Sequence, residues 1–292
     1  VASTGTNNRV MTSLDGTNWT IRTSAADVGW YSVCWSPELS LFVAVASSGV
    51  GNRVMTSPNG INWTKRTSAA DYDWRSVCWS PELSLFVAVA SSGVDERVMT
   101  SPDGINWTIR DSAADNNWVS VCWSPELSLF VAVAITGSGN RVMSSPNGTN
   151  WTIRTSAADN NWYSVCWSPG LSLFVAIAIS GVGNRVMTSP DGANWTIRTS
   201  AADNSWRSVC WSPELSLFVA VAYSGAGNRV MTTLSIGYRP SFRFIQTVRS
   251  DSLSMVHTHD YPSNTRLYYK VNSIDKFGRK SPVSHVIRIL TI

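Results

Sequence analysis

The strongest constraint on this 292-residue chain is an internal repeat of 44 residues. Arg-Val-Met occurs six times, first at Arg9 and last at Arg229, and every step is 44 residues. All 15 Trp and all 5 Cys keep the same spacing. In repeat architectures each repeat is one supersecondary unit that buries its apolar face against its neighbours. The chain must therefore fold as an array of near-identical units.

One repeat predicts four short strands. Residues 31–36 alternate, 41–47 form a continuous apolar run, 53–57 alternate again, and 63–68 follow an Asn-Gly turn. An unbroken apolar run is typical of a strand that is buried on both faces, and Asn-Gly favours a tight hairpin. Since no window keeps a helical period, the pattern predicts an all-β fold, a β-propeller with four-stranded blades.

The turn between the third and fourth expected strands resembles the Asp box, or BNR repeat, of sialidase-type propellers. The family pattern is roughly Ser-x-Asp-x-Gly-x-Thr-Trp, and Ser101-Pro-Asp-Gly-Ile-Asn-Trp107 is similar to it, with one residue fewer before Gly and Asn instead of Thr. In two copies Asn also replaces Asp. The resemblance covers residues 1–233. It implies a structural turn made by Asp15, Gly16, Trp19, Asn59, Gly60, Trp63, Asp103, Gly104, Trp107, Asn147, Gly148, Trp151, Asp191, Gly192 and Trp195.

Catalytic chemistry is not favoured by this repeat. Enzyme sites bring a few unlike groups to one point, whereas a near-exact repeat supplies like groups around an axis. All 3 His lie after residue 233, and four of the five Glu before it lie in the repeated Pro-Glu-Leu-Ser turn. The Arg series that begins at Arg9 either points to a common site or pairs with nearby carboxylates. We expect no catalytic residue, no metal site and no cofactor.

The copies differ mainly in the loop before the first expected strand and in the loop after the second. In a four-stranded blade both loops lie on one face. Loops on a rigid scaffold commonly hold binding sites, and aromatic rings with amide side chains suit sugars. The alternative is drift in tolerant loops, with the invariant Trp packed between blades. The residues expected to contact a ligand are Trp30, Tyr31, Trp74, Arg75, Asn116, Asn117, Trp118, Asn160, Asn161, Trp162, Tyr163, Trp206 and Arg207.

The five Cys occupy one equivalent position in the first expected strand. Equivalent positions on neighbouring blades lie beyond the Cα separation that a disulfide allows. We expect all five thiols to be reduced, buried and unreactive.

Residues 234–292 form a second region. Their net charge is +6, against −2 for residues 1–233, and strands are expected near 241–248, 252–259, 266–274 and 284–291. The stretch 266–282 resembles the last hairpin of a fibronectin type III domain. This basic region is either a docking element for a protein partner or for self-assembly, or a β-subdomain that covers the end of the propeller.

Two ring closures are possible. A five-bladed ring takes the missing strand of the last blade from residues 18–23. A six-bladed ring, which we prefer, completes that blade with 241–248 and pairs 252–259 and 266–274 with 9–13 and 18–23.

The composition narrows the function. The net charge of +4 is too small to indicate nucleic-acid binding. The sequence contains no run of 18 apolar residues, so we expect no membrane insertion. The chain begins at Val1 without a signal segment, so we expect a processed product or an excerpt. The preferred hypothesis is a non-enzymatic, multivalent, lectin-like adhesion propeller that binds a glycan or a surface receptor, on an extracellular or virion surface. The alternatives are a structural subunit of a virion, tail or filament, and a sialidase-like glycosidase.

Overall fold

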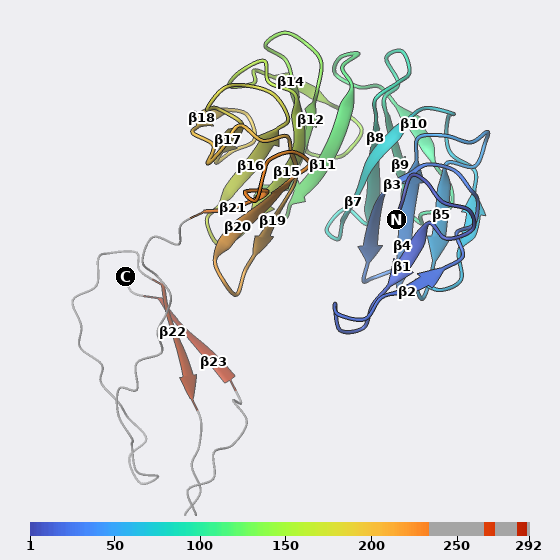
Figure 1. Cartoon of the computed structure of the whole chain (residues 1–292), viewed down its shortest axis with the longest axis horizontal. Coiled ribbons are helices and arrows are strands. Elements are labelled where there is room, and N and C mark those ends of the chain that lie inside the picture. Colours follow the sequence, from blue (N-terminus) through green and yellow to red (C-terminus); the bar gives the residue numbers. More distant parts are fainter. Residues whose placement is uncertain (234–265, 272–284, 291–292) are drawn as a thin grey trace, which may run out of the picture. The chain divides into compact units, whose positions relative to one another are not determined.

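The computed structural model describes residues 1–233 and, after them, the strands at 266–271 and 285–290. The chain divides into two compact units, Val1–Leu234 and Ser235–Ile292. Every regular element of the described residues is a β-strand (Figure 1). The predicted all-β fold is confirmed, and the units of the first region recur every 44 residues.

The first and second strands of each blade match the repeat. The first strands are β3 (Trp30–Ser36), β7 (Trp74–Ser80), β11 (Trp118–Ser124), β15 (Trp162–Ser168) and β19 (Trp206–Ser212). The second strands are β4 (Leu41–Ala46), β8 (Leu85–Ala90), β12 (Leu129–Ala134), β16 (Leu173–Ala178) and β20 (Leu217–Ala222).

The third and fourth strands are shorter. The third strands are β1 (Val10–Thr12), β5 (Val54–Ser57), β9 (Val98–Ser101), β13 (Val142–Ser145), β17 (Val186–Ser189) and β21 (Val230–Thr232). The fourth strands are β2 (Thr20–Arg22), β6 (Thr64–Arg66), β10 (Thr108–Arg110), β14 (Thr152–Arg154) and β18 (Thr196–Arg198). Four blades have four antiparallel strands, β19–β21 form a three-stranded sheet, and β1–β2 form a two-stranded one.

The second strand carries the core because both of its faces are buried. In β8, Phe86 and Ala88 pack with the preceding blade, where they meet Val43 and Val45. Val87, on the opposite face, packs with the following blade. This two-sided burial explains the continuous apolar run. The small Ala side chains on one face leave room for large side chains of the same interface.

Neighbouring blades approach each other most closely at their first strands, β3 to β7, β7 to β11, β11 to β15 and β15 to β19. The blades follow one another in chain order, which the colour sequence of Figure 1 traces from β3 to β21. The first strands therefore lie innermost, and the side chains at their start are brought together from different blades.

The turn between the third and fourth strands is closed by its own side chains. Asn106 N donates to Asp103 Oδ1 (2.8 Å), and Gly104 N donates to Ser101 Oγ (2.8 Å). Gly104 has a φ of +73°, a region that favours glycine. Trp107 Nε1 donates to the Gly104 carbonyl (3.1 Å). The structural role predicted for this turn agrees with these contacts.

The carboxylates of these turns are held in their ionised form. Partial burial raises the pKa of Asp103, but the hydrogen bonds from the backbone and side chain of Asn106 outweigh this effect and lower the pKa to about 2. The pKa of Asp191 is lowered to about 2 for the same reason. Asn59 and Asn147 accept the equivalent backbone bonds without a charge.

A repeated hydrogen bond joins adjacent blades at the Pro-Glu-Leu-Ser turn. Trp79 Nε1 donates to Glu38 Oε2 over 2.7 Å, and the bonds of Trp123 to Glu82 and of Trp167 to Glu126 are equally long. The last blade lacks this bond. Gly170 stands where the other copies have Glu, and the buried Trp211 Nε1 has no hydrogen-bond partner among the described residues.

Both ends of the blade series expose faces that are covered elsewhere. Trp35 of the first blade is 39% exposed, whereas Trp79 is 7% exposed. In the last blade Val221 and Val230 are exposed, although their equivalents Val89 and Val98 are fully buried. These faces are open because, within the described residues, the first blade has only the β1–β2 pair before it and the last has no blade after it.

The predicted closures are not both compatible with the observed pairing. β2 pairs with β1 and β21 pairs with β20, so the five-bladed exchange of residues 18–23 is absent from the described strands. The six-bladed closure uses 241–248 and 252–259, which lie outside the described residues. Its third tail strand, predicted at 266–274, corresponds to β22 (Arg266–Val271), which pairs with β23 (His285–Leu290).

The five Cys are free, but they are not all buried. Burial raises the pKa of the Cys78 and Cys122 thiols well above the ordinary value and that of Cys34 and Cys166 to about 11. Cys210 is exposed, which corrects the expectation that all five thiols are shielded. Cys34 packs against the next blade, and no described blade plays this part for Cys210.

The missing bond at Gly170 predicts a stabilising substitution. Because φ at Gly170 is not positive, Glu fits the backbone, and its Cβ would lie 3.2 Å from Trp211 Cζ2, so the ring must shift slightly. We expect Gly170→Glu to raise the free energy of unfolding by about 1 kcal/mol or more over Gly170→Ala, which has a Cβ but no acceptor. Denaturant titration checks this, and equal stability of the two variants would contradict the account.

Candidate binding site

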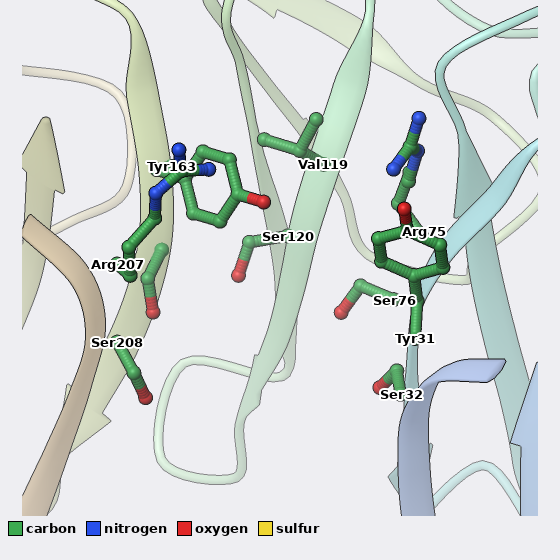
Figure 2. A pocket seen from close by; sticks show the side chains of 10 residues that line it. Tyr31, Ser32, Arg75, Ser76, Val119, Ser120, Tyr163, Arg207 and Ser208 are labelled. Atoms are coloured by element: carbon green, nitrogen blue, oxygen red, sulfur yellow. The ribbon is translucent and has the colours of Figure 1, made fainter. Parts of the chain in front are cut away.

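The start of the first strands lines a pocket of about 290 Å³, here called the channel pocket. Five blades contribute two consecutive residues each: the one after the invariant Trp and the Ser that follows it. Figure 2 shows these side chains converging from separate strands. The lining residues are Tyr31, Ser32, Arg75, Ser76, Val119, Ser120, Tyr163, Ser164, Arg207 and Ser208.

A β-bulge aims the first of these positions into the pocket. In the second blade Trp74 pairs with Ala90 and Ser76 pairs with Val89, so Arg75 between them has no partner on β8. The same shift occurs in the other four blades. A bulge adds one residue to a strand and redirects its side chain. The bulged position is therefore free of the packing constraints of the sheet.

Two Arg side chains of the pocket lie over Tyr rings from the preceding blade. The guanidinium carbon of Arg75 is 4.3 Å from the ring centre of Tyr31, and that of Arg207 is 4.3 Å from the ring centre of Tyr163. Arg207 also lies 5.5 Å from the ring centre of Tyr223. Cation–π contacts of this kind typically contribute about 0.5–1 kcal/mol at exposed positions. They hold each guanidinium in place and leave its donors available.

The charges of Arg75 and Arg207 have no carboxylate partner among the described residues. Arg75 Nε donates only to the hydroxyl of Ser91, over 2.9 Å. None of the residues that line the pocket is acidic. The repeated Arg of the Arg-Val-Met motif differs, since it pairs with an Asp at N–O distances of 3.3 to 3.8 Å in Arg9, Arg53, Arg97, Arg141 and Arg185. The Arg-Val-Met series is structural, and the two pocket Arg are not neutralised.

The pocket serines bond to the next blade and still have a hydroxyl proton available. Ser32 Oγ accepts a hydrogen bond from the backbone of Val77 in the next blade (3.2 Å), and Ser76, Ser120 and Ser164 repeat this contact. A hydroxyl that accepts one bond still has its own proton to donate. No bond donated by these hydroxyls occurs within the described part of the chain. The pocket therefore offers donors from Ser, Tyr and Arg side chains.

The Trp residues expected to form a ligand platform are buried. Trp74, Trp118, Trp162 and Trp206 have no exposed surface, and Trp30 has 1%. Each indole N–H donates to a carbonyl of the Ala-Ala-Asp segment four residues earlier, as Trp118 does to Ala114 over 2.9 Å. This corrects the expected role of the series. The rings pack between blades, which was the alternative reading of the sequence, and leave no face for a ligand.

The Asn residues of the same loops brace the loops. Asn116 Nδ2 donates to the Asn140 carbonyl (2.8 Å), and Asn160 makes the same contact in the next blade. Asn117 and Asn161 accept hydrogen bonds from Arg97 and Arg141, over 3.0 and 2.8 Å. Of the residues expected to contact a ligand, the channel pocket brings together only Tyr31, Arg75, Tyr163 and Arg207.

Sequence reasoning missed the pocket serines and Val119. An invariant Ser in a repeat predicts a structural role, and these serines have one as well, because they bond to the next blade. The signal that identifies the site is the position after the invariant Trp. It varies as Tyr, Arg, Val, Tyr and Arg inside an otherwise nearly constant strand.

No group of three or more His, Cys, Asp or Glu is placed to hold a metal ion in the part of the chain that the structure describes. No helix there has the length and hydropathy needed to cross a membrane.

Comparison with known proteins supports the fold. No protein-family model and no curated protein matches the sequence. Among solved structures, the chain is similar to one in a nidogen/laminin complex, with 11% identity, a TM-score of 0.54 and coverage of 72% of this chain and 78% of that one. It is also similar to the hydrazine synthase of Kuenenia stuttgartiensis, with 14% identity, a TM-score of 0.55 and coverage of 73% of this chain and 76% of that one. A third similar structure is a chain of a mitotic checkpoint complex, with 14% identity, a TM-score of 0.55 and coverage of 72% of this chain and 63% of that one.

At such low identity these likenesses establish the fold and not the activity. Together with the repeated four-stranded sheets, they define residues 1–233 as a β-propeller.

Adjacent residues of the first strand should respond very differently to truncation. Trp118 is fully buried between blades, so Trp118→Ala should lower the free energy of unfolding by about 3–5 kcal/mol. Val119 faces the channel pocket, so Val119→Ala should cost about 1 kcal/mol or less. Chemical denaturation measures both. Equal losses for the two variants would show that the bulged position belongs to the packing interface.

Proposed function

We propose that this chain is a non-enzymatic binding propeller that recognises a glycan or another surface ligand in the channel pocket, on an extracellular or virion surface. One observation carries the proposal. A single bulged position gathers unlike side chains from five blades above a layer of constant Ser hydroxyls. Structural positions of this repeat are nearly identical in every blade, whereas this one varies and faces a cavity.

The chemistry of the lining suits a sugar. Tyr rings offer flat apolar faces, and Ser and Arg donate hydrogen bonds to hydroxyl or acidic oxygens. The volume of about 290 Å³ is at the lower end of the range for small-ligand pockets. The two Arg–Tyr pairs can make equivalent contacts with one ligand. They replace the five Trp side chains that the sequence analysis expected to contact the ligand.

The absence of acidic residues from the pocket lining supports a role without catalysis. Most glycoside hydrolases use a pair of carboxyl groups about 5–9.5 Å apart on either side of the scissile bond, and the sialidase type uses a Tyr nucleophile. The sialidase type is also expected to need a Glu beside that Tyr and an acidic Asp. The carboxylates of the box turns, such as Asp103, are engaged by the backbone of their own turn.

A scaffold role is the second candidate, and the open end faces favour it. Trp79 of the second blade bonds Glu38 of the first blade. Trp35 is the equivalent residue of the first blade, and it is exposed. Glu214 of the last blade is the equivalent acceptor. The first blade therefore offers the Trp side of a blade–blade contact and the last blade offers the Glu side. Two copies of the chain could join through these complementary faces.

A glycan array tests the binding function. We expect saturable binding by the native chain and by Lys65→Ile, which removes an exposed outer-strand charge and installs the residue that three other blades carry. The double variant Tyr31→Ala and Tyr163→Ala should lose the signal, because both ring faces of the pocket are gone. A folded native chain with no saturable glycan binding would favour the scaffold role. Turnover of a fluorogenic glycoside would contradict the non-enzymatic proposal.

A further inference from the structure

We propose that the channel pocket binds a compact acidic glycan through two anionic groups, one at each Arg–Tyr pair, an inference that rests on the binding function above and specifies its ligand class. The pairs are Tyr31 with Arg75 and Tyr163 with Arg207. Their members come from β3 and β7 and from β15 and β19.

The first step is the sign of the ligand charge. The pocket contains two guanidinium groups without a carboxylate partner among the described residues, and its serines have free hydroxyl protons. Arg offers a planar fork of N–H donors that matches carboxylate and sulfate groups. An anionic group is the ligand that satisfies these donors, while a neutral sugar would leave the Arg charges uncompensated.

The second step is the number of anionic groups. Corresponding members of the two pairs are three 44-residue repeats apart, so the pairs are copies of one arrangement. Figure 2 shows Arg75 beside Tyr31 and Arg207 beside Tyr163, with Val119 of the intervening blade between the two groups. Because both pairs line one pocket, a single ligand with two acidic groups engages both of them.

The third step is the size of the ligand. Long polyanions such as nucleic acids depend on many Lys and Arg contacts to successive phosphates. The first region has a net charge of −2, and only two Arg reach the pocket. In five repeats the Arg of the Arg-Val-Met motif is paired with an Asp, so this series adds no uncompensated positive charge. The observations favour a short acidic saccharide over a nucleic acid.

Isothermal titration of the whole chain tests the inference. The probes are a disulfated disaccharide, its monosulfated and unsulfated counterparts, and a disaccharide with two carboxylates. We expect the disulfated sugar to bind one-to-one and about tenfold more tightly than the monosulfated one, since one charge-assisted contact is lost. Comparison with the dicarboxylated sugar identifies which acidic group is preferred.

Variants locate the two contacts. Arg75→Ala and Arg207→Ala should each abolish the preference for two sulfates over one, and Lys65→Ile should keep it. Arg75→Lys, which retains the charge but not the planar fork, should retain only part of the preference. Val119→Glu places a carboxylate in the pocket without altering either Arg, so it should also abolish binding. This variant tests the site if an Arg variant fails to fold.

Several results would overturn the inference. These are equal affinity for monosulfated and disulfated sugars, two independent monosulfated sites per chain, and unchanged binding by Val119→Glu. Tighter binding of a single-stranded oligonucleotide than of the disulfated sugar would also overturn it. Saturable binding of the unsulfated sugar with no effect of charge would reject the acidic ligand but leave the proposed function standing. No binding of any saccharide would reject both.

Discussion

The interface between adjacent blades is the contact on which the rest of this structure depends. Each blade inserts a buried Trp and a Phe against the Val side chains of the blade before it, with Ala residues making room. Two hydrogen bonds also join the blades: Trp79 Nε1 donates to Glu38, and the Val77 backbone N–H donates to Ser32. Apolar burial supplies most of the stabilisation, while the hydrogen bonds fix the register of one blade on the next.

This interface also explains which positions of a blade can differ from copy to copy. In the inner blades, residues on both faces of the second strand pack against a neighbouring blade, and the loop Asn and Arg residues bond to each other. The β-bulge after the invariant Trp releases one position from the interface. Arg75 is such a residue, and Trp74 directly before it is fully buried. Repetition of the bulge in five blades assembles these positions into one pocket.

Much of the fold follows from the sequence, because the repeat period, the apolar second strand and the box turn are local patterns. The candidate site follows only in part. The variation between copies identifies Tyr31 and Arg75. Trp118 was expected to contact a ligand, with packing between blades as the alternative, since an aromatic residue beside a loop suits either a site or a core. Only the pairing register shows the bulge that separates these roles. The way the ring closes depends on contacts between residues far apart in the sequence, which no local pattern records.

The central claim is that the variable residues of the site, unlike the constant serines beside them, are not needed for the fold. Its most direct test is a thermal melt of a variant in which Tyr31, Arg75, Tyr163 and Arg207 are all replaced by Val, as the third blade already carries at Val119. The account predicts a cooperative transition with a melting temperature within a few degrees of the native one, since the buried Trp, Phe and Val side chains between blades are untouched. A large drop in melting temperature, or loss of the cooperative transition, would show that these side chains hold the blades together.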